Sequence, residues 1–371
     1  MSPIDRRLIV SVNWPLLLLA LAIFAVGVLN LYSASGFRMG EEVSLQSFFN
    51  KQIIWGGCGL FAMLLVVLVD YKHLGNVAWP LFFVTILLLV LVLLTGRTVS
   101  GARRWIEIGG FNFQPSELAK FAVLILGAKL LAKRSEKLGW LELFAVVGLG
   151  LVPAVLVVVE PDLGTGLTIL MLLCGLILYR GIAGPVFKTL LVAVPVLLPC
   201  GWFVLKPYQK QRILTLLDPE KDPLGTGYHI IQSRIAIGSG QMWGKGFLEG
   251  TQSQLRYLPE KHTDFALAVF AEEWGFVGCI ALLVLFCFFL LQIYATARTS
   301  KDRFGSFLAA GVFFYFFWQI LINMGMVLGI MPVVGIPLPF ISYGGSATIV
   351  NFCLVGIVVN VSMRRFVFKK T

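Results

Sequence analysis

The sequence predicts an all-α, polytopic membrane protein with about ten transmembrane helices. Of its 371 residues, 58% are hydrophobic and only 13% are charged, whereas a soluble domain is typically about a quarter charged. Apolar runs long enough to cross a bilayer recur along the whole chain, so length says little about the number of domains. We interpret residues 1–371 as a single integral membrane domain.

Each predicted span is close to the roughly 20 residues that a helix needs to cross the hydrocarbon. In chain order the spans cover residues 14–33, 52–69, 74–95, 116–133, 139–159, 163–180, 185–205, 266–296, 304–329 and 345–363. Small residues, "YSASG", follow the first span, as they would follow a signal peptide. Its apolar run exceeds the roughly 7–15 residues of a signal peptide core and more spans follow, so we keep it as a helix.

Lysine and arginine residues indicate the side of the membrane that each loop occupies, because cytoplasmic loops carry an excess of both. With a cytoplasmic N-terminus, the short outer loops hold mainly Arg38, Lys51, Arg97, Arg103 and Arg104. The inner segments hold Arg6, Arg7, Lys72, Lys133, Arg134, Lys137, Arg180, Arg298, Lys301, Arg303, Arg364, Arg365, Lys369 and Lys370. We therefore predict that both termini are cytoplasmic, and we attribute the net charge of +11 to these loops rather than to nucleic-acid binding.

Cysteine and histidine give no metal or disulfide pattern. The six cysteines lie inside apolar runs without a C-x-x-C pair, which is typical of small buried hydrophobic residues. His73, His229 and His262 are far apart in sequence, which argues against a zinc site.

Two outer segments and one irregular segment interrupt the spans. Residues 206–263 form one long polar insertion whose aromatic residues and glycines predict a large, ordered extracytoplasmic loop. Residues 96–117 form a second outer segment. "MPVVGIPLPFISYGGS", residues 331–346, contains three prolines and three glycines and cannot remain helical. Such backbone at membrane depth is buried in protein or lines a wet cavity, so a cavity wall and an ordinary connecting loop both remain open.

Asp264 is the first candidate for chemistry. It lies in "LPEKHTDFALAVFAEEWG", residues 258–275, where polar residues give way to a predicted span. Thr263 could cap the following helix, which would place Asp264 in the first turn and favour its anionic form. An ionised carboxylate there could accept a proton, although a purely structural role at the helix start is the alternative.

A two-carboxylate hydrolase is a weaker interpretation of the same stretch. Glu272 and Glu273 follow Asp264 by eight and nine residues, which is about 12–14 Å along a straight helix. Catalytic carboxylates of glycosidases lie roughly 5–9.5 Å apart. We expect these glutamates to pair with a basic group inside the bundle.

Basic residues on the predicted outer face suggest an anionic ligand. Arg103 and Arg104 lie in the second outer segment, and Lys206, Lys210 and Arg212 begin the long loop. Guanidinium groups bind phosphate bidentately and lysine binds it as a point charge. The long-loop residues could instead anchor the chain at the level of the lipid headgroups.

Two acidic segments have both a structural and a functional interpretation. Glu117 precedes Lys120 by three residues on one face of a predicted helix, so the two could form an ion pair or contact substrate. Glu160 and Asp162, in "EPDLGTG", could hold a divalent cation or simply form a turn.

Several motifs together resemble the SEDS family of shape, elongation, division and sporulation proteins. They are "FNFQPSELAK", "EPDLGTG", "GYHIIQS", "GKGFLEGTQSQL", "AEEWG" and "MPVVGIPLPFISYGGS". The resemblance covers essentially the whole chain. "GYHIIQS", "GKGFLEGTQSQL" and "AEEWG" look like the rod-shape elongation branch, RodA, rather than the division branch, FtsW.

The resemblance implies a peptidoglycan glycosyltransferase in the bacterial plasma membrane, with its active site on the extracytoplasmic face. Members of the family polymerise lipid II, a disaccharide-pentapeptide on undecaprenyl pyrophosphate, and work with a class B penicillin-binding protein that crosslinks the product. The acidic residue of the family's "HTD" motif is essential, and Asp264 matches it here.

The implied reaction explains one acid surrounded by cations. Asp264 would take the proton from the GlcNAc 4-hydroxyl as it attacks the donor sugar, with inversion to a β-1,4 linkage. Positive charge from protein or from Mg²⁺ or Mn²⁺ would stabilise the leaving pyrophosphate. The candidate substrate contacts are Arg103, Arg104, Lys120, Lys210 and Arg212, with Glu117 orienting Lys120 and His262 and Glu260 flanking the base.

Two other function classes fit part of the pattern. A lipid II flippase would also have many spans, broken helices and intramembrane charges, although the chain has no clear internal repeat. A non-enzymatic scaffold for cell-wall enzymes is the third class. Formation of glycan polymer from lipid II would distinguish an enzyme from a flippase and from a scaffold.

Overall fold

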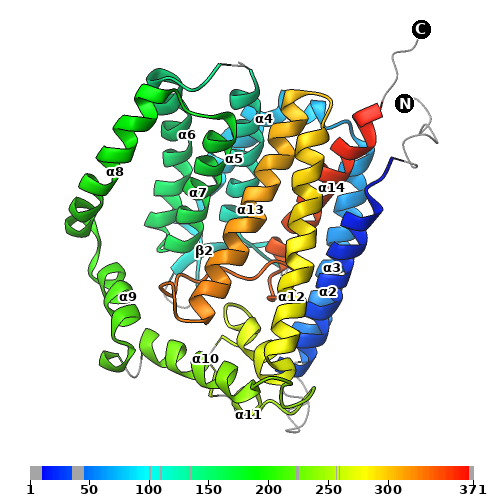
Figure 1. The fold of residues 1–371 in the computed structure, drawn as a ribbon, viewed down its shortest axis with the longest axis vertical. Coiled ribbons are helices and arrows are strands. Elements are labelled where there is room, and N and C mark those ends of the chain that lie inside the picture. The colour runs from blue at the N-terminus through cyan, green and yellow to red at the C-terminus, as the bar shows by residue number, and fades with distance from the viewer. Residues whose placement is uncertain are drawn as a thin grey trace.

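The computed structural model describes residues 11–35, 46–99, 102–108, 111–133, 136–222, 225–255, 257, 258 and 260–366. Long helices form a bundle, and short helices with a small sheet gather at one of its ends (Figure 1). The long helices are α2 Trp14–Ala34, α3 Gln46–Leu68, α4 Lys72–Thr95, α5 Pro115–Ala132, α6 Trp140–Val159, α7 Leu163–Arg180, α8 Gly184–Val204, α12 Ala266–Thr299, α13 Arg303–Val327 and α14 Gly345–Met363.

The helical membrane fold is confirmed. Among the described residues, nine helices are long and apolar enough to cross a membrane. The predicted span that is not among these nine is 116–133. It corresponds to α5, whose charged residues Glu117, Lys120 and Lys129 lower its hydropathy. α3 begins at Gln46 rather than at residue 52, because the helix continues through the polar residues that precede the apolar run. The start of α2 and the end of α14 lie at the same end of the bundle (Figure 1).

Among the nine candidate spans in the described residues, α13 and α14 are the most buried, with 67% of their apolar windows buried. α8 is the least buried span and lies at the edge (Figure 1). After Lys188 and Thr189 near its start, α8 is almost entirely apolar, whereas α13 carries buried amides such as Gln319 and Asn323. A polar side chain inside a membrane bundle needs a partner within the protein.

A three-stranded antiparallel sheet is the departure from an all-α fold. Its strands are β1 Arg97–Val99, β2 Ala102–Ile108 and β3 Phe111–Phe113, in the order β1-β2-β3. Ile106 of β2 pairs with Phe113, and the backbone N–H of Gln114 then donates to Ser346 Oγ at 3.2 Å. β1 and β3 have three residues each, and the seven residues of β2, ARRWIEI, do not alternate strictly between polar and apolar, so the sequence did not predict this small sheet within the helical fold.

The long loop is ordered in its described part, as predicted. It contains α9 Pro207–Leu217, the 3₁₀ turn η2 Pro219–Lys221, α10 Thr226–Gly240 and α11 Thr251–Gln254. α10 is tied to the end of α13: Ser233 Oγ donates to the carbonyl of Val327 at 2.7 Å, and Arg234 donates to the carbonyl of Gly329 at 2.9 Å. The loop therefore forms a cover over one end of the bundle rather than a tether.

α12 is broken at Gly275, where φ is 63°, a region that favours glycine. The loop of residues 241–246 bonds to the carbonyls released by the break. The N–H of Lys245 donates to the carbonyl of Glu272 at 3.0 Å, and the N–H of Gly246 donates to the carbonyl of Glu273 at 3.1 Å. Backbone groups cannot stay unpaired at membrane depth, so the break requires this loop.

The same loop satisfies the other side of the break. The N–H of Phe276 donates to the carbonyl of Gln241 at 2.8 Å, and the N–H of Val277 donates to the carbonyl of Met242 at 3.1 Å. The break and the loop thus form one interlocked backbone unit.

Glu272 pairs with a basic group, as the sequence predicted. Its fully buried carboxylate lies 2.7 Å from Lys245 Nζ and accepts from the backbone N–H of Gln252 at 2.9 Å and of Ser253 at 3.3 Å. For the neighbouring Glu273 the prediction was wrong: within the described residues its carboxylate accepts from Ser33 Oγ rather than from a basic group. These contacts hold α11 and the 241–246 loop against α12.

Gly244→Ala tests the interlock. A Cβ at Gly244 would lie 2.0 Å from the carbonyl oxygen of Glu273, so we expect destabilisation of at least about 1–3 kcal/mol. Thermal unfolding of detergent-purified protein measures it. Gly238→Ala is the matched control because a Cβ there meets nothing within 4 Å, and it should be neutral or stabilising by up to about 1 kcal/mol. Equal stability of the two variants would contradict the interlock.

Candidate active site

Asp264 lies in a turn just before α12, not in its first helical turn. The helix begins at Ala266, and no side chain caps it. Thr263 Oγ1 instead donates to the carboxylate of Glu260 at 3.1 Å. The backbone N–H of Phe265 donates to the backbone carbonyl of Glu260 at 3.3 Å. The expected cap by Thr263 was therefore wrong, because the Thr263 hydroxyl donates to Glu260 in the preceding turn instead of capping α12.

Asn323 of α13 positions the backbone of Asp264. Its side-chain amide donates to the carbonyl of Asp264 at 2.9 Å and to the carbonyl of Ile336 at 2.8 Å. One buried amide thus joins the turn before α12 to the irregular segment 331–344. The sequence offered one signal for it, a polar residue inside an apolar span, which is typically functional or structurally paired.

The segment of residues 331–344 is non-helical and largely buried in protein, as its prolines and glycines predicted. Ser342 Oγ donates to the carbonyl of Thr263 at 2.5 Å, and the N–H of Tyr343 donates to the carbonyl of His262 at 2.8 Å. A Cβ added at Gly335, whose φ is 74°, would lie 3.4 Å from Asp264 Oδ2. The segment is therefore a wall against Asp264 and not merely a connection.

The charge of Asp264 is set by opposing effects. Its pKa is raised to about 6, chiefly by burial and then by the negative charge of Glu260, with a smaller contribution from Asp162. The positive charges of Arg104 and Arg212 oppose this shift. The side chain keeps partial exposure. At pH 7 the carboxylate is therefore mostly ionised and its pKa is close enough to neutrality for proton transfer.

Arg104, from β2, lies over the junction between α6 and α7. Its guanidinium is 3.8 Å from the carboxylate of Asp162. Asp162 also caps α7 by accepting from the N–H of Thr165 at 3.0 Å, and it accepts from Gln114 Nε2 at 3.2 Å. The sheet, α5 and α7 therefore converge on one carboxylate, and the "EPDLGTG" stretch is a turn.

Glu160 is the unusual residue of this junction. It is fully buried, and within the described residues neither of its carboxylate oxygens has a hydrogen-bond partner. Burial, and then the charge of Asp162, raises the pKa of Glu160 to about 8, while Arg104 opposes the shift. No group of three or more His, Cys, Asp or Glu side chains in the described part of the chain could hold a metal ion. Glu160 and Asp162 together are only a pair of carboxylates.

Glu117 and Lys120 form a buried ion pair inside the bundle. Lys120 Nζ lies 2.7 Å from the Glu117 carboxylate, and both side chains are less than 5% exposed. Lys120 also lies over the ring of Tyr315, 5.3 Å from its centroid. The pair connects α5 to α13, which is the structural alternative that the spacing left open.

The remaining basic candidates are Arg212, Lys210 and Arg103. Arg212 of α9 lies 5.9 Å from the ring of Tyr208 and acts electrostatically on Asp264. Lys210 lies 5.8 Å from the ring of Trp202, a contact typical of an interfacial anchor. Arg103 belongs to β2, and its side chain lies outside the described part of the structure.

Two histidines flank the acid, and both are neutral at pH 7. His262 stacks on Phe48 with ring centroids 5.2 Å apart, and burial lowers its pKa to about 4. His229 of α10 stacks on Phe265 at 5.7 Å, and burial likewise lowers its pKa. His229 had no assigned role in the sequence-based site, because nothing in the sequence places α10 beside Asp264. A neutral imidazole does not supply the positive charge that a pyrophosphate requires.

Comparisons with known proteins agree with this arrangement. The chain matches the cell cycle protein family of FtsW, RodA and SpoVE over residues 13–366. Peptidoglycan glycosyltransferase MrdB of Escherichia coli (strain K12) is 40% identical, over 96% of this chain and 95% of the relative. A probable peptidoglycan glycosyltransferase FtsW of Geobacter metallireducens is also 40% identical, over 94% of each chain.

Solved structures share the fold over the same length. A chain from a peptidoglycan synthase complex that coordinates polymerization and crosslinking has a TM-score of 0.81 at 33% identity, over 96% of this chain and 99% of that chain. RodA of Thermus thermophilus has a TM-score of 0.71 at 30% identity, over 96% of this chain and 98% of that chain. The resemblance to the SEDS family that the motifs predicted is confirmed, and the chain belongs to the FtsW, RodA and SpoVE family.

Proposed function

We propose that this protein is a peptidoglycan glycosyltransferase that polymerises lipid II during cell elongation. The observation that carries the proposal is a single, partly buried carboxylate, Asp264, whose charge is balanced by Arg104 and Arg212. The relatives are named peptidoglycan glycosyltransferases, which favours an enzyme over a flippase or a scaffold. MrdB and FtsW relatives reach the same identity, so the elongation role rests on the motifs of the long loop.

Asp264 is the general base in this proposal. The 4-hydroxyl of the GlcNAc of lipid II attacks the anomeric carbon of the growing glycan chain, and its proton passes to the Asp264 carboxylate. The bond between that carbon and the pyrophosphate oxygen breaks, and undecaprenyl pyrophosphate leaves. A single displacement inverts the α-linked donor to a β-1,4 product. A carboxylate with a pKa of about 6 suits this role near neutral pH.

The leaving pyrophosphate needs positive charge rather than a proton. Arg104 and Arg212 are the cations whose charge reaches Asp264, so we assign them as the main contacts of the pyrophosphate, with Lys210 and Arg103 as further candidates. The attraction between a preorganised cation and the departing oxygen becomes stronger as negative charge develops on that oxygen. Lys120 is already neutralised by Glu117, and we assign this pair to positioning α5 rather than to direct contact. His262 shapes the turn that carries the base.

We place the divalent cation, Mg²⁺ or Mn²⁺, at the carboxylates of Glu160 and Asp162. Carboxylate oxygens are preferred ligands of Mg²⁺ and Mn²⁺, and the two oxygens of Glu160 lack hydrogen-bond partners within the described residues. A bound cation supplies charge for the pyrophosphate. Because Glu160 has a pKa of about 8, cation binding must release its proton and is therefore stronger at high pH.

One structural relative supports the proposed partner, and the distribution of lysine and arginine supports the proposed orientation. We propose that the protein works with a class B penicillin-binding protein, since one structural relative belongs to a complex that couples polymerization to crosslinking. The distribution of lysine and arginine favours a cytoplasmic position for the end of the bundle where α2 begins. The site around Asp264 lies at the other end and therefore faces outward, where a lipid-linked sugar can meet it from the bilayer.

Asp264→Asn should abolish polymerisation, with a loss of about 10²–10⁴-fold, because an amide cannot accept the proton. The assay is glycan polymer formed from lipid II by the purified protein with its penicillin-binding partner, checked by muramidase digestion. Asp218→Asn is the matched control, since Asp218 forms an exposed pair with Lys221 at 3.0 Å. Full activity of Asp264→Asn would remove the base from the mechanism, whereas lipid scrambling without polymer would favour a flippase.

The rate should fall as the pH drops through about 6, because protonated Asp264, with a pKa of about 6, cannot act as a base. Glu260→Gln removes a negative charge that raises this pKa, so it should shift the acidic limb to lower pH. Arg104→Gln removes an opposing positive charge and should shift the limb to higher pH. Initial rates measured across about pH 5–8 test both directions. A limb that neither substitution moves would belong to another group.

Chelation tests the proposed cation site. EDTA should stop polymerisation, and Mg²⁺ or Mn²⁺ should restore it. Glu160→Gln should raise the cation concentration needed for half-maximal rate by at least about tenfold. Glu142→Gln is the control, because Glu142 pairs with Arg180 at 3.0 Å away from this junction. An undiminished rate in EDTA would assign the whole stabilisation of the pyrophosphate to arginine and lysine.

A further inference from the structure

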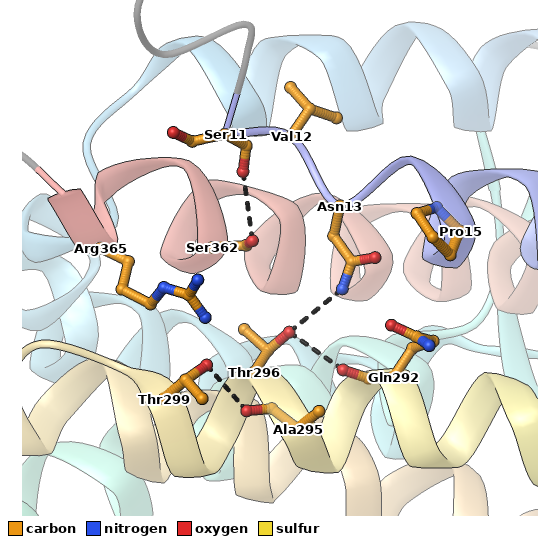
Figure 2. A pocket seen from close by; sticks show the side chains of 10 residues that line it. All are labelled: Ser11, Val12, Asn13, Pro15, Gln292, Ala295, Thr296, Thr299, Ser362 and Arg365. Carbon is orange, nitrogen blue, oxygen red and sulfur yellow. Dashed lines mark hydrogen bonds between the residues drawn. The ribbon is translucent and has the colours of Figure 1, made fainter.

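The side chain of Gln114 has no role in the mechanism above, and its contacts are unusual for its position. Gln114 directly precedes α5, where a polar side chain typically caps the helix that follows. Asn13 does this for α2, since its side chain accepts from the N–H of Leu16 at 3.1 Å. Asn13 also donates to Thr296 in the hollow at the opposite end of the bundle (Figure 2). The side chain of Gln114 does not cap α5 and is bonded to another helix instead.

Two parts of Gln114 are tied to two different helices. Its backbone N–H donates to Ser346 Oγ, in the first turn of α14, at 3.2 Å. Its side-chain amide donates to Oδ2 of Asp162, the residue that caps α7, also at 3.2 Å. The start of α5 is thus joined to the starts of α7 and α14. A substitution of the side chain can therefore break the bond to Asp162 and leave the bond to Ser346 in place.

The carboxylate of Asp162 is already well supplied with donors. Oδ1 accepts from the N–H of Thr165 at 3.0 Å, and Oδ2 accepts from Thr165 Oγ1 at 2.9 Å as well as from Gln114. A carboxylate oxygen offers about two lone-pair sites, so both sites of Oδ2 are occupied. Arg104 Nη1 lies 3.8 Å from this oxygen. That distance allows electrostatic attraction but is too long for a hydrogen bond.

Arg104 therefore keeps hydrogen-bond donors for another ligand. Its side chain is 31% exposed, and within the described residues its Nε has no hydrogen-bond partner. An arginine that paired fully with Asp162 would form charge-assisted bonds of about 2.7–2.9 Å. It would then spend both its donors and its charge on that carboxylate.

We propose that Gln114 is a positioning residue: its amide occupies Asp162 Oδ2, prevents a direct hydrogen bond with Arg104, and so keeps this guanidinium available to the departing pyrophosphate. The inference rests on the function proposed above, in which Arg104 stabilises that leaving group. Thr165, the other donor to Oδ2, belongs to α7 itself. Without the Gln114 amide, one lone pair of Oδ2 becomes free, and Arg104 can close the gap of 3.8 Å.

A double-mutant cycle with Arg104 tests the proposal on the full chain with its penicillin-binding partner, at saturating lipid II and Mg²⁺. Gln114→Met keeps the length of the side chain and removes the donor. We expect it to lower the initial polymerisation rate about tenfold, as for the loss of one hydrogen bond to a charged group. Because Gln114 acts through Arg104, the same substitution should change the rate by less than about twofold in the Arg104→Gln background. A merely structural role would multiply the two losses.

Gln211→Met is the matched control. It makes the same change at an exposed glutamine of α9 and should leave the rate unchanged in both backgrounds. Gln114→Leu also lacks the donor and should show the same loss, so it replaces the methionine variant if that protein unfolds. Losses that multiply, or full activity of the Gln114 variants, would overturn the inference while the role of Arg104 stands. Full activity of Arg104→Gln would overturn the pyrophosphate contact and the role of Gln114 with it.

Discussion

Backbone groups released where a membrane helix breaks must find partners within the protein, and this constraint organises the whole active-site end. At Gly275 the loop of residues 241–246 supplies those partners, and the buried ion pair between Glu272 and Lys245 fixes the loop in place. At residues 331–344 the side chain of Asn323 and the hydroxyl of Ser342 do the same. The second device also holds the turn that carries Asp264, because Asn323 donates to the carbonyl of Asp264 and Ser342 to the carbonyl of Thr263. The position of the acid is therefore a consequence of how the irregular segment 331–344 is satisfied.

The electrostatics of the site follow from that position. The turn places Asp264 where burial disfavours its charge, and Arg104 and Arg212 restore enough stability for ionisation near neutral pH. Arg104 can do this because the small sheet carries it over the junction of α6 and α7, where Asp162 holds it at 3.8 Å. A base and a cation thus come from elements that are distant in sequence. Glu160 lies buried beside them, and its carboxylate oxygens have no hydrogen-bond partner within the described residues.

Hydropathy was sufficient to predict the long helices, whereas the assignment of Asp264 as the base, which comes from the family motifs, stays a prediction. The spacing of Glu117 and Lys120 predicted their ion pair because helical geometry alone brings such residues together. The small sheet was not predicted because β1 and β3 have only three residues each and β2 shows no strict alternation of polar and apolar residues. The cap by Thr263 was wrong because the turn at Glu260 competes for the hydroxyl. Asn323 and His229 could not be assigned, since their roles depend on contacts across the bundle that no local pattern contains.

The account's central claim is that Asp264 receives the proton of the attacking sugar hydroxyl. The most direct test is an experimental structure of this protein with a non-hydrolysable donor analogue and lipid II bound together. The account predicts that the GlcNAc 4-oxygen lies within hydrogen-bond reach, about 2.6–3.2 Å, of the Asp264 carboxylate, with the pyrophosphate against Arg104. An acceptor hydroxyl bound beside another base, with Asp264 turned away from both sugars, would contradict it.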